Sequence, residues 1–138
     1  MTHVETMDEI NAQFIDVFQK LQKKLDEKRS SKHVDLIKKM NDIIDRDYAN
    51  QNLSLNSIAD ELAMSSIYIS RLYKQHTMVA ITDVIQDVRM RKSKSLLLST
   101  SLSVAEIAEK TGFTNDSYFY RLFKKYNGIT PNDFPQTA

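Results

Sequence analysis

Apolar side chains recur every three or four residues along much of this chain, which is the period of an amphipathic α-helix. The first such stripe consists of Ile10, Phe14, Phe18, Leu21 and Leu25. A second helix is predicted over residues 33–48, and residues 29–32 are the expected joint between the two helices. The inward face of this second helix is expected to be Leu36, Ile37, Met40, Ile43 and Ile44.

Residues that permit tight turns are rare. Glycine and proline occur twice each, at Gly112, Gly128, Pro131 and Pro135. Long β-hairpins and glycine-rich phosphate loops are therefore not expected, because both need such residues at several positions. The chain is predicted to be all-α.

The apolar stripe of the first helix needs a partner surface, because apolar side chains on one face of a helix are most stable when they are buried. Two partners remain open. One is the rest of the chain, and the other is the same stripe of a second copy, which would form a homodimer through the N-terminal helix. The helix itself is interpreted either as an ordinary packed helix or as a coiled-coil connector for signalling.

A repeat in the second half of the chain carries the functional argument. Ile-Ala at residues 58–59 recurs at residues 107–108, which are 49 positions later. The sequence ISRLYK at residues 69–74 matches FYRLFK at residues 119–124, which are 50 positions later. An extra residue is tolerated in a turn but would disrupt a helix face. Each copy is therefore predicted to be helix, turn, helix.

Capping residues indicate where these helices begin. Ser54 or Asn56 can cap the first helix of the earlier copy, and Ser65 can cap its second helix. In the later copy Ser103 is followed three residues on by Glu106, which is the spacing of a capping box. These signals predict helix-turn-helix units at about residues 54–76 and 103–126.

Inside each unit, small residues are expected where the two helices approach closely. Ala59 and Ala108 take these positions, since a larger side chain would force the helices apart. Gly112 is expected to supply a permissive turn in the later unit. The buried stripe of the second helices is predicted to be Ile69, Leu72 and Tyr73, and then Phe119, Leu122 and Phe123. Tyr68 and Tyr118 are also interpreted as core residues.

The opposite faces of these second helices suit a DNA groove. The outward sets are Ser66, Ile67, Ser70, Arg71 and Lys74 in one helix, and Asp116, Ser117, Tyr120, Arg121 and Lys124 in the other. Arginine can bind guanine through two hydrogen bonds, an apolar side chain can contact a thymine methyl group, and lysine can pair with phosphate. A solvated face is the ordinary explanation of one arginine, but Arg71 and Arg121 recur at one register.

Composition narrows the alternatives. Cysteine is absent, which excludes disulfides and thiolate chemistry and fits a reducing compartment, so the cytoplasm is expected. No apolar run reaches the length of about 18 residues that a membrane span needs, so no membrane contact is expected. The net charge is only +1, but ten basic against eight acidic residues follow position 48. His3, His33 and His76 lack metal-ligand spacing, so neither a metal nor another cofactor is expected.

With these motifs the sequence resembles the AraC/XylS family of bacterial transcription regulators over residues 37–134. The resemblance includes both helix-turn-helix units, the stretch at residues 81–100, and the closing Gly128-Ile129-Thr130-Pro131 with Phe134. It implies seven helices in two subdomains, a linker helix at about residues 82–98, and recognition helices entering successive major grooves on one DNA face. It also implies a regulator, an activator in particular, with RNA polymerase as a further partner.

By this resemblance the ten outward residues become DNA-binding residues, with Lys74 and Lys124 nearer phosphate. Arg89 matches a favoured arginine and is assigned a structural role in the linker helix. Two positions depart from the family pattern: Met78 replaces the glycine that usually ends the first recognition helix, and Pro135 replaces an arginine.

The predicted organisation is an N-terminal helical extension or connector at residues 1–32 and an AraC-type DNA-binding domain at residues 33–138. The competing function is a helical protein-interaction module that stacks its repeat without reading DNA, although such solenoids normally need at least three repeats. An enzyme is not expected, because no nucleophile, base and orienting group coincide.

Overall fold

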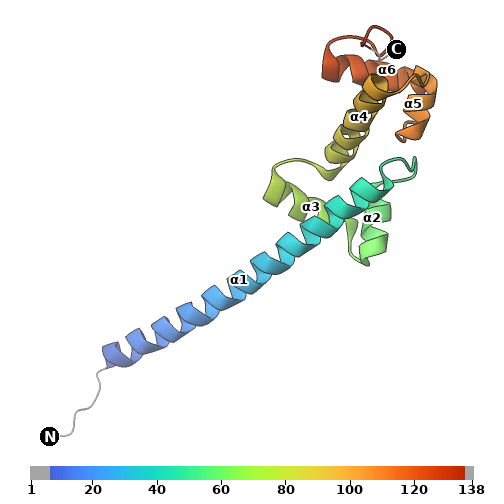
Figure 1. Ribbon diagram of the computed structural model, residues 1–138. Coiled ribbons are helices and arrows are strands. Elements are labelled where there is room, and N and C mark those ends of the chain that lie inside the picture. Colours follow the sequence, from blue (N-terminus) through green and yellow to red (C-terminus); the bar gives the residue numbers. More distant parts are fainter. Residues whose placement is uncertain (1–6, 136–138) are drawn as a thin grey trace, which may run out of the picture. The chain divides into compact units, whose positions relative to one another are not determined.

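The computed structural model describes residues 7–135, which form six α-helices and no strands (Figure 1). In chain order these are α1 (Met7–Asp47), α2 (Leu55–Leu62), α3 (Ser66–Thr77), α4 (Ile81–Ser99), α5 (Val104–Lys110) and α6 (Asp116–Asn127). The chain divides into two units, Met1–Lys38 and Lys39–Ala138. The prediction of an all-α fold with two helix-turn-helix subdomains, a linker helix and an N-terminal helical extension is confirmed.

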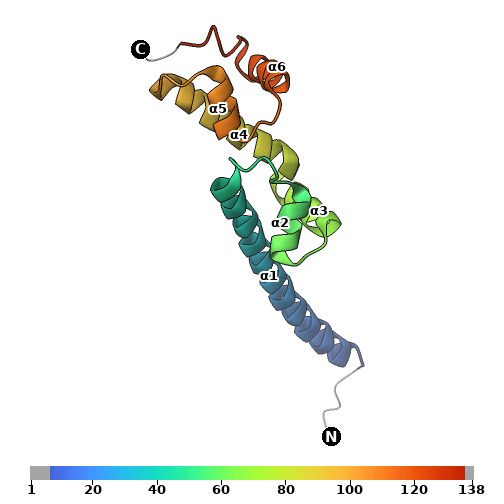
Figure 2. The ribbon, with the colours of Figure 1, turned by 90° about the vertical axis from the view of Figure 1, so that its right-hand side faces the viewer.

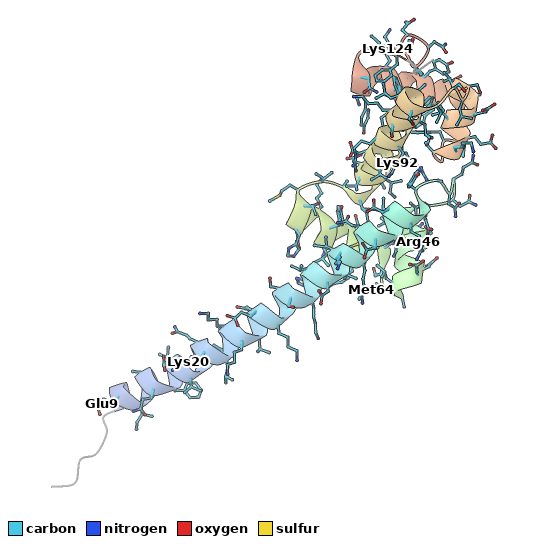
Figure 3. All side chains as sticks on the ribbon, viewed as in Figure 1. Glu9, Lys20, Arg46, Met64, Lys92 and Lys124 are labelled. Atoms are coloured by element: carbon cyan, nitrogen blue, oxygen red, sulfur yellow. The ribbon has the colours of Figure 1, made fainter. Side chains whose placement is uncertain are left out.

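The first unit is the N-terminal part of α1. Its apolar stripe is exposed: Phe14 keeps 72% of its accessible surface, and Phe18, Leu21 and Leu25 each keep more than half. A single helix offers no second element against which to bury such a stripe. The face therefore remains available, and Figure 3 shows side chains projecting all along this part of α1.

The expected joint at residues 29–32 is wrong, because α1 continues without a break from Met7 to Asp47. The Arg-Ser-Ser-Lys segment contains neither glycine nor proline. Serine costs only about 0.5 kcal/mol relative to alanine within a helix, which is too little to interrupt a strong neighbouring helical pattern.

The second unit places one helix-turn-helix on each half of α4. Helices α2 and α3 form the first pair and α5 and α6 the second, while α4 contacts both α3 and α5. Two views show α4 running between the pairs (Figures 1 and 2). The last part of α1 belongs to this unit, where the Tyr73 hydroxyl donates to the Asn41 side chain over 2.7 Å.

Two apolar cores hold the second unit together. In the first half the fully buried apolar side chains include Met40, Ile44, Ile58, Ile69 and Ile81. In the second half one cluster comprises Met90, Leu97, Ile107, Ala108, Phe113, Phe119, Leu122 and Phe123. Each fully buried large apolar side chain contributes about 1.5–3 kcal/mol. Ser93 and Thr111 are buried between α4 and α5, with their hydroxyl oxygens 2.9 Å apart.

The two helix-turn-helix units begin their helices in the same way. Ser54 and Ser103 are the N-cap residues of α2 and α5, and Ser65 and Asn115 are those of α3 and α6. Each cap side chain accepts a hydrogen bond from a backbone N–H of the first helical turn, which satisfies a donor that would otherwise be unpaired.

The turns explain the change of offset from 49 to 50. The N–H of Met64 donates to the carbonyl of Ala59, and the N–H of Phe113 donates to that of Ala108, so the offset is still 49 there. The next caps are 50 residues apart, which places the extra residue in the turn at Thr114. The insertion therefore lies outside the helices.

The seventh helix that the family resemblance implies is not present among residues 7–135. After α6 the chain forms a single turn, in which the Thr130 carbonyl accepts hydrogen bonds from the N–H groups of Asp133 and Phe134. Phe134 packs against the second core, with its ring 5.4 Å from that of Phe123. This turn therefore closes the second core without a further helix.

Equivalent caps at the ends of α3 and α6 yield the first prediction. Met78 and Gly128 both adopt the left-handed conformation, with φ of 64° and 79°. Met78 is 81% exposed and gains little from packing, and a Cβ on Gly128 would meet nothing within 4 Å. We expect Met78→Gly to raise the free energy of unfolding by about 0.5–1 kcal/mol and Gly128→Ala to lower it by about 1 kcal/mol. Urea titrations measure both, and equal effects of one sign would contradict this explanation.

Candidate nucleic-acid interface

Helices α3 and α6 present the same pattern of burial. Each has 12 residues, and the two helices are 50 positions apart. From residue 69 to residue 81 every position has the same burial class as its counterpart from 119 to 131. The predicted buried stripes are correct, because Ile69, Leu72, Tyr73, Phe119, Leu122 and Phe123 are all buried. The opposite faces are therefore presented to solvent at the same register.

The first surface is an open groove along α3. It is lined by Leu55, Ser66, Ile67, Ser70, Arg71, Lys74 and Gln75. All five residues predicted on this helix are among them. Ile67 is 70% exposed, Arg71 and Lys74 are exposed, and the two serines are half-buried. The structure thus brings an apolar side chain, two hydroxyls and two cations onto one face.

The second surface lies along α6, where Asp116, Ser117, Arg121 and Lys124 are exposed and Tyr120 is half-buried. A shallow hollow between α6 and α4 is lined by Gln86, Tyr118, Arg121, Leu122 and Lys125. Of the predicted residues only Arg121 lines it, while the Tyr120 hydroxyl lies 3.3 Å from the Asn132 side chain. Figure 3 marks the side chain of Lys124 on α6.

Each surface is held by a core beneath it. Helix α6 buries Phe119 and Phe123 against Phe113, whose ring lies 4.9 Å from that of Phe119. Helix α3 is fixed by Ile69 and by the Tyr73 hydrogen bond to α1. Such rigid support keeps the outward side chains in a fixed frame, which selective recognition requires.

The assignment of Tyr68 and Tyr118 to the core is wrong. Tyr68 is 45% exposed and Tyr118 is 38% exposed. They lie near the start of their helices, one residue before the buried Ile69 and Phe119, so they point beside the stripe and not into it. The Tyr118 hydroxyl accepts a hydrogen bond from Gln86 of α4. Both rings are thus available beside the outward sets.

Sequence reasoning missed two outward positions, Gln75 and Lys125. They lie four residues after Arg71 and Arg121, which is one helical turn further on the same face. Extending the outward stripe by one more turn would have found them. Lys125 adds a third cation to α6, and because Asp116 offsets one of the three, the two surfaces carry the same net charge.

Other kinds of site are not marked in the described part of the chain. Residues 7–135 contain no group of three or more His, Asp or Glu side chains placed to hold a metal ion. His3 lies outside the described residues. No helix within that range has the length and apolarity that crossing a membrane requires.

Comparison with known proteins agrees with this arrangement. The sequence model of a family described as "Helix-turn-helix domain" matches residues 58–137. Among solved structures, the C-terminal domain of AraT, a response regulator from Geobacillus stearothermophilus, superposes with a TM-score of 0.72 at 32% identity. That match covers 75% of this chain and 88% of the AraT domain.

Two curated relatives are also similar. The Msm operon regulatory protein of Streptococcus mutans is 36% identical over 112 residues, which is 80% of this chain and 39% of that protein. The bifunctional transcriptional activator/DNA repair enzyme AdaA of Bacillus subtilis is 35% identical over 108 residues, 78% of this chain and 49% of AdaA. The chain thus spans less than half the length of these relatives.

The paired helix-turn-helix units, their shared linker helix and these matches define the class: a DNA-binding domain of a transcription regulator. The chain belongs to the AraC/XylS family and corresponds to the DNA-binding domain of its members.

Proposed function

We propose that this chain recognises a specific double-stranded DNA sequence, using α3 and α6 to read two neighbouring segments of the major groove. The observation that supports it is the recurrence of an exposed arginine and lysine, Arg71 with Lys74 and Arg121 with Lys124, above matching cores. Charged side chains that only contact solvent need not recur at the same positions of two helices. Two recognition helices that both contact DNA do need them at the same positions.

Each outward set has chemistry suited to base edges or phosphates. Arg71 and Arg121 are assigned to base contacts, because the guanidinium can bind guanine through two hydrogen bonds. Ile67 is assigned to a thymine methyl group, and Ser66, Ser70 and Ser117 to bases or phosphates. Asp116 can accept from the cytosine amino group, and Tyr120 completes the second set. Lys74 and Lys124 are assigned to phosphate.

The two surfaces differ in chemistry, which favours a target with two unlike halves. Ile67 corresponds to Ser117, and Ser66 corresponds to Asp116. An apolar contact in one half and an acidic acceptor in the other cannot favour the same base pairs. An asymmetric site fits this arrangement better than a palindrome.

As part of a regulator, the chain is proposed to act as an activator with RNA polymerase as a protein partner. AdaA, which shares 35% identity with it, is named a transcriptional activator. The proposed location is the cytoplasm, where bacterial DNA lies. Residues 33–138 are proposed as the DNA-binding domain and residues 1–32 as the extension or connector.

The N-terminal extension is proposed to pair with a second copy. Phe14, Phe18, Leu21 and Leu25 are spaced by four, three and four residues, as in the a and d positions of a coiled coil, and all four are exposed. Pairing with the same stripe of a second copy would bury them, since residues 7–38 form one helix with no second helix beside it.

Replacing the proposed base readers should change sequence preference. We expect Arg71→Ala or Arg121→Ala to lose about 1–3 kcal/mol of binding free energy and to relax preference at one or two base pairs. Lys74→Ala or Lys124→Ala should weaken all duplexes alike and reduce the salt slope by about one. Selection from a random duplex library, followed by titration, measures these changes.

Circular dichroism is the control in that series, because Leu72→Ala or Phe123→Ala should unfold the unit instead. Even losses with unchanged base preference would show that both arginines only contact phosphate. If the parent chain prefers no duplex over competitor DNA, the interaction-module interpretation would hold instead.

The target should be bipartite. We expect two half-sites whose centres lie about 34 Å apart, one turn of DNA, because the family resemblance implies that the two recognition helices, joined by a single linker helix, enter successive major grooves on one DNA face. Footprinting on the selected duplex measures this spacing. Protection of a single short segment would contradict reading by both helices.

Self-association is tested by a charge on the stripe. Leu21→Glu should convert a dimer into a monomer, while Gln19→Glu, an exposed neighbour off the stripe, should leave the dimer intact. Sedimentation equilibrium measures the mass of all three proteins. A monomeric parent at every concentration would remove the dimer proposal and leave DNA reading untouched.

A further inference from the structure

Arg89 lies in the middle of α4 and holds the loop that follows α1. Its Nε donates to the carbonyl oxygen of Tyr48 and its Nη2 to that of Asn50, each over 2.8 Å. Hydrogen bonds from a charged donor are roughly twice as strong as neutral ones. Partial burial lowers the pKa of the Arg89 guanidinium from its ordinary value, but arginine stays charged in proteins.

The same loop approaches the second helix-turn-helix very closely. A Cβ added at Gly112 would overlap the carbonyl oxygen of Tyr48 and lie 2.7 Å from Nε of Arg89. The Gln51 side chain also donates to the carbonyl of Phe113 over 3.4 Å. The turn between α5 and α6 is therefore seated directly on the Tyr48 carbonyl and the Arg89 side chain.

The repeat shows that this crowding is specific to the second copy. Ala63 corresponds to Gly112, 49 positions earlier, and also has a positive φ, of 53°. That turn accepts a Cβ, so a left-handed turn alone does not demand glycine in this motif. Glycine is required at position 112 because the Tyr48 carbonyl oxygen and the Arg89 side chain leave no room for a Cβ.

The loop is also fastened to the first helix-turn-helix through α1. Tyr73 of α3 donates to Asn41, and Arg46 pairs with Glu61 of α2. The Nζ of Lys92 lies 5.5 Å from the centre of the Tyr48 ring. The end of α1 and its loop thus join both copies, alongside the connection that α4 makes.

We propose that Arg89, with the carbonyls of Tyr48 and Asn50 and the close approach of Gly112 to them, forms a clamp that fixes the orientation of α6 relative to α3. Arg89 is a positioning residue: it contacts no DNA and acts through the loop. This proposal rests on the proposed function, because a fixed orientation matters for a duplex that both helices must reach together.

The physical effect is one of effective concentration. When the first helix is bound, a rigid clamp holds the second at its half-site, and this raises affinity at one spacing and lowers it at all others. Without the clamp, α4 and the weaker contacts of the loop, such as the long Gln51 hydrogen bond to Phe113, remain as connections between the two copies, and the second helix samples more orientations. Affinity then falls at the correct spacing and becomes less sensitive to changes in it.

A distance measurement without DNA tests the clamp directly. The chain has no cysteine, so Gln75→Cys and Lys125→Cys, exposed equivalents on α3 and α6, can carry two spin labels. We expect a narrow distribution of distances between the labels in the parent and a broader one in Arg89→Gln. The distribution in Arg89→Lys should be intermediate, because the single nitrogen of lysine cannot make both hydrogen bonds of the guanidinium in the same geometry. Arg91→Gln is the matched control, because Arg91 lies on the same helix and pairs with the exposed Asp87 one turn earlier.

Binding supplies the second readout, with unlabelled chains and the duplex that the parent selects. One inserted base pair between the half-sites should weaken the parent and Arg91→Gln at least tenfold, but Arg89→Gln no more than about threefold. At the original spacing Arg89→Gln should bind at least tenfold more weakly than the parent, while a duplex carrying one half-site should be bound equally by both.

The outcomes are distinct. An unchanged distance distribution in a folded Arg89→Gln protein would overturn the clamp, as would a parent-like spacing penalty. Equal losses on one-half-site and complete duplexes would also overturn it, since Arg89 would then support only the local fold or contact DNA itself. If the parent selects no duplex, the proposed function fails, and the distance distributions still decide whether the clamp exists.

Discussion

Neither helix-turn-helix can bury its own apolar surface. The second unit depends on α4, which packs against the apolar faces of both. Helices α2 and α5 have only eight and seven residues, too short to be stable without tertiary packing. The first half of α4 buries Ile81, Ile85 and Val88, and the second half buries Met90, Ser93 and Leu97. One helix therefore serves as the third wall of both cores, and the folding of each copy is tied to the same element.

Features that depend on spacing within one helix could be predicted from the sequence. Burial on a helix follows a period of 3.6, so the stripes of α3 and α6 could be placed, and caps such as Ser65 and Ser103 follow from local hydrogen bonding. The joint at residues 29–32 was mistaken because two serines are a weak signal against continuous helical propensity. The prediction that Tyr68 and Tyr118 are core residues was wrong because an aromatic residue beside a buried stripe has the same local sequence pattern as one within it.

The partners of Arg89 could not be predicted for a different reason. They are backbone carbonyls some 40 positions away, which carry no side-chain signature, and only the tertiary arrangement brings them to α4. For the outward residues, by contrast, the correct helix face could be predicted from the sequence. The predicted set ended one helical turn before Gln75 and Lys125. Contacts between side chains of one helix follow from spacing, whereas contacts to a distant loop do not.

The crowding at Gly112 has a consequence for how the two copies can change. The turn at Ala63 already contains a Cβ and is exposed, so the main constraint on the residue at that position is its positive φ. Position 112 is confined by the Tyr48 carbonyl and the Arg89 side chain, and any larger residue must move one of them. The two halves of this internal repeat therefore tolerate substitutions unequally. The second copy must keep its glycine for as long as the loop after α1 packs against position 112.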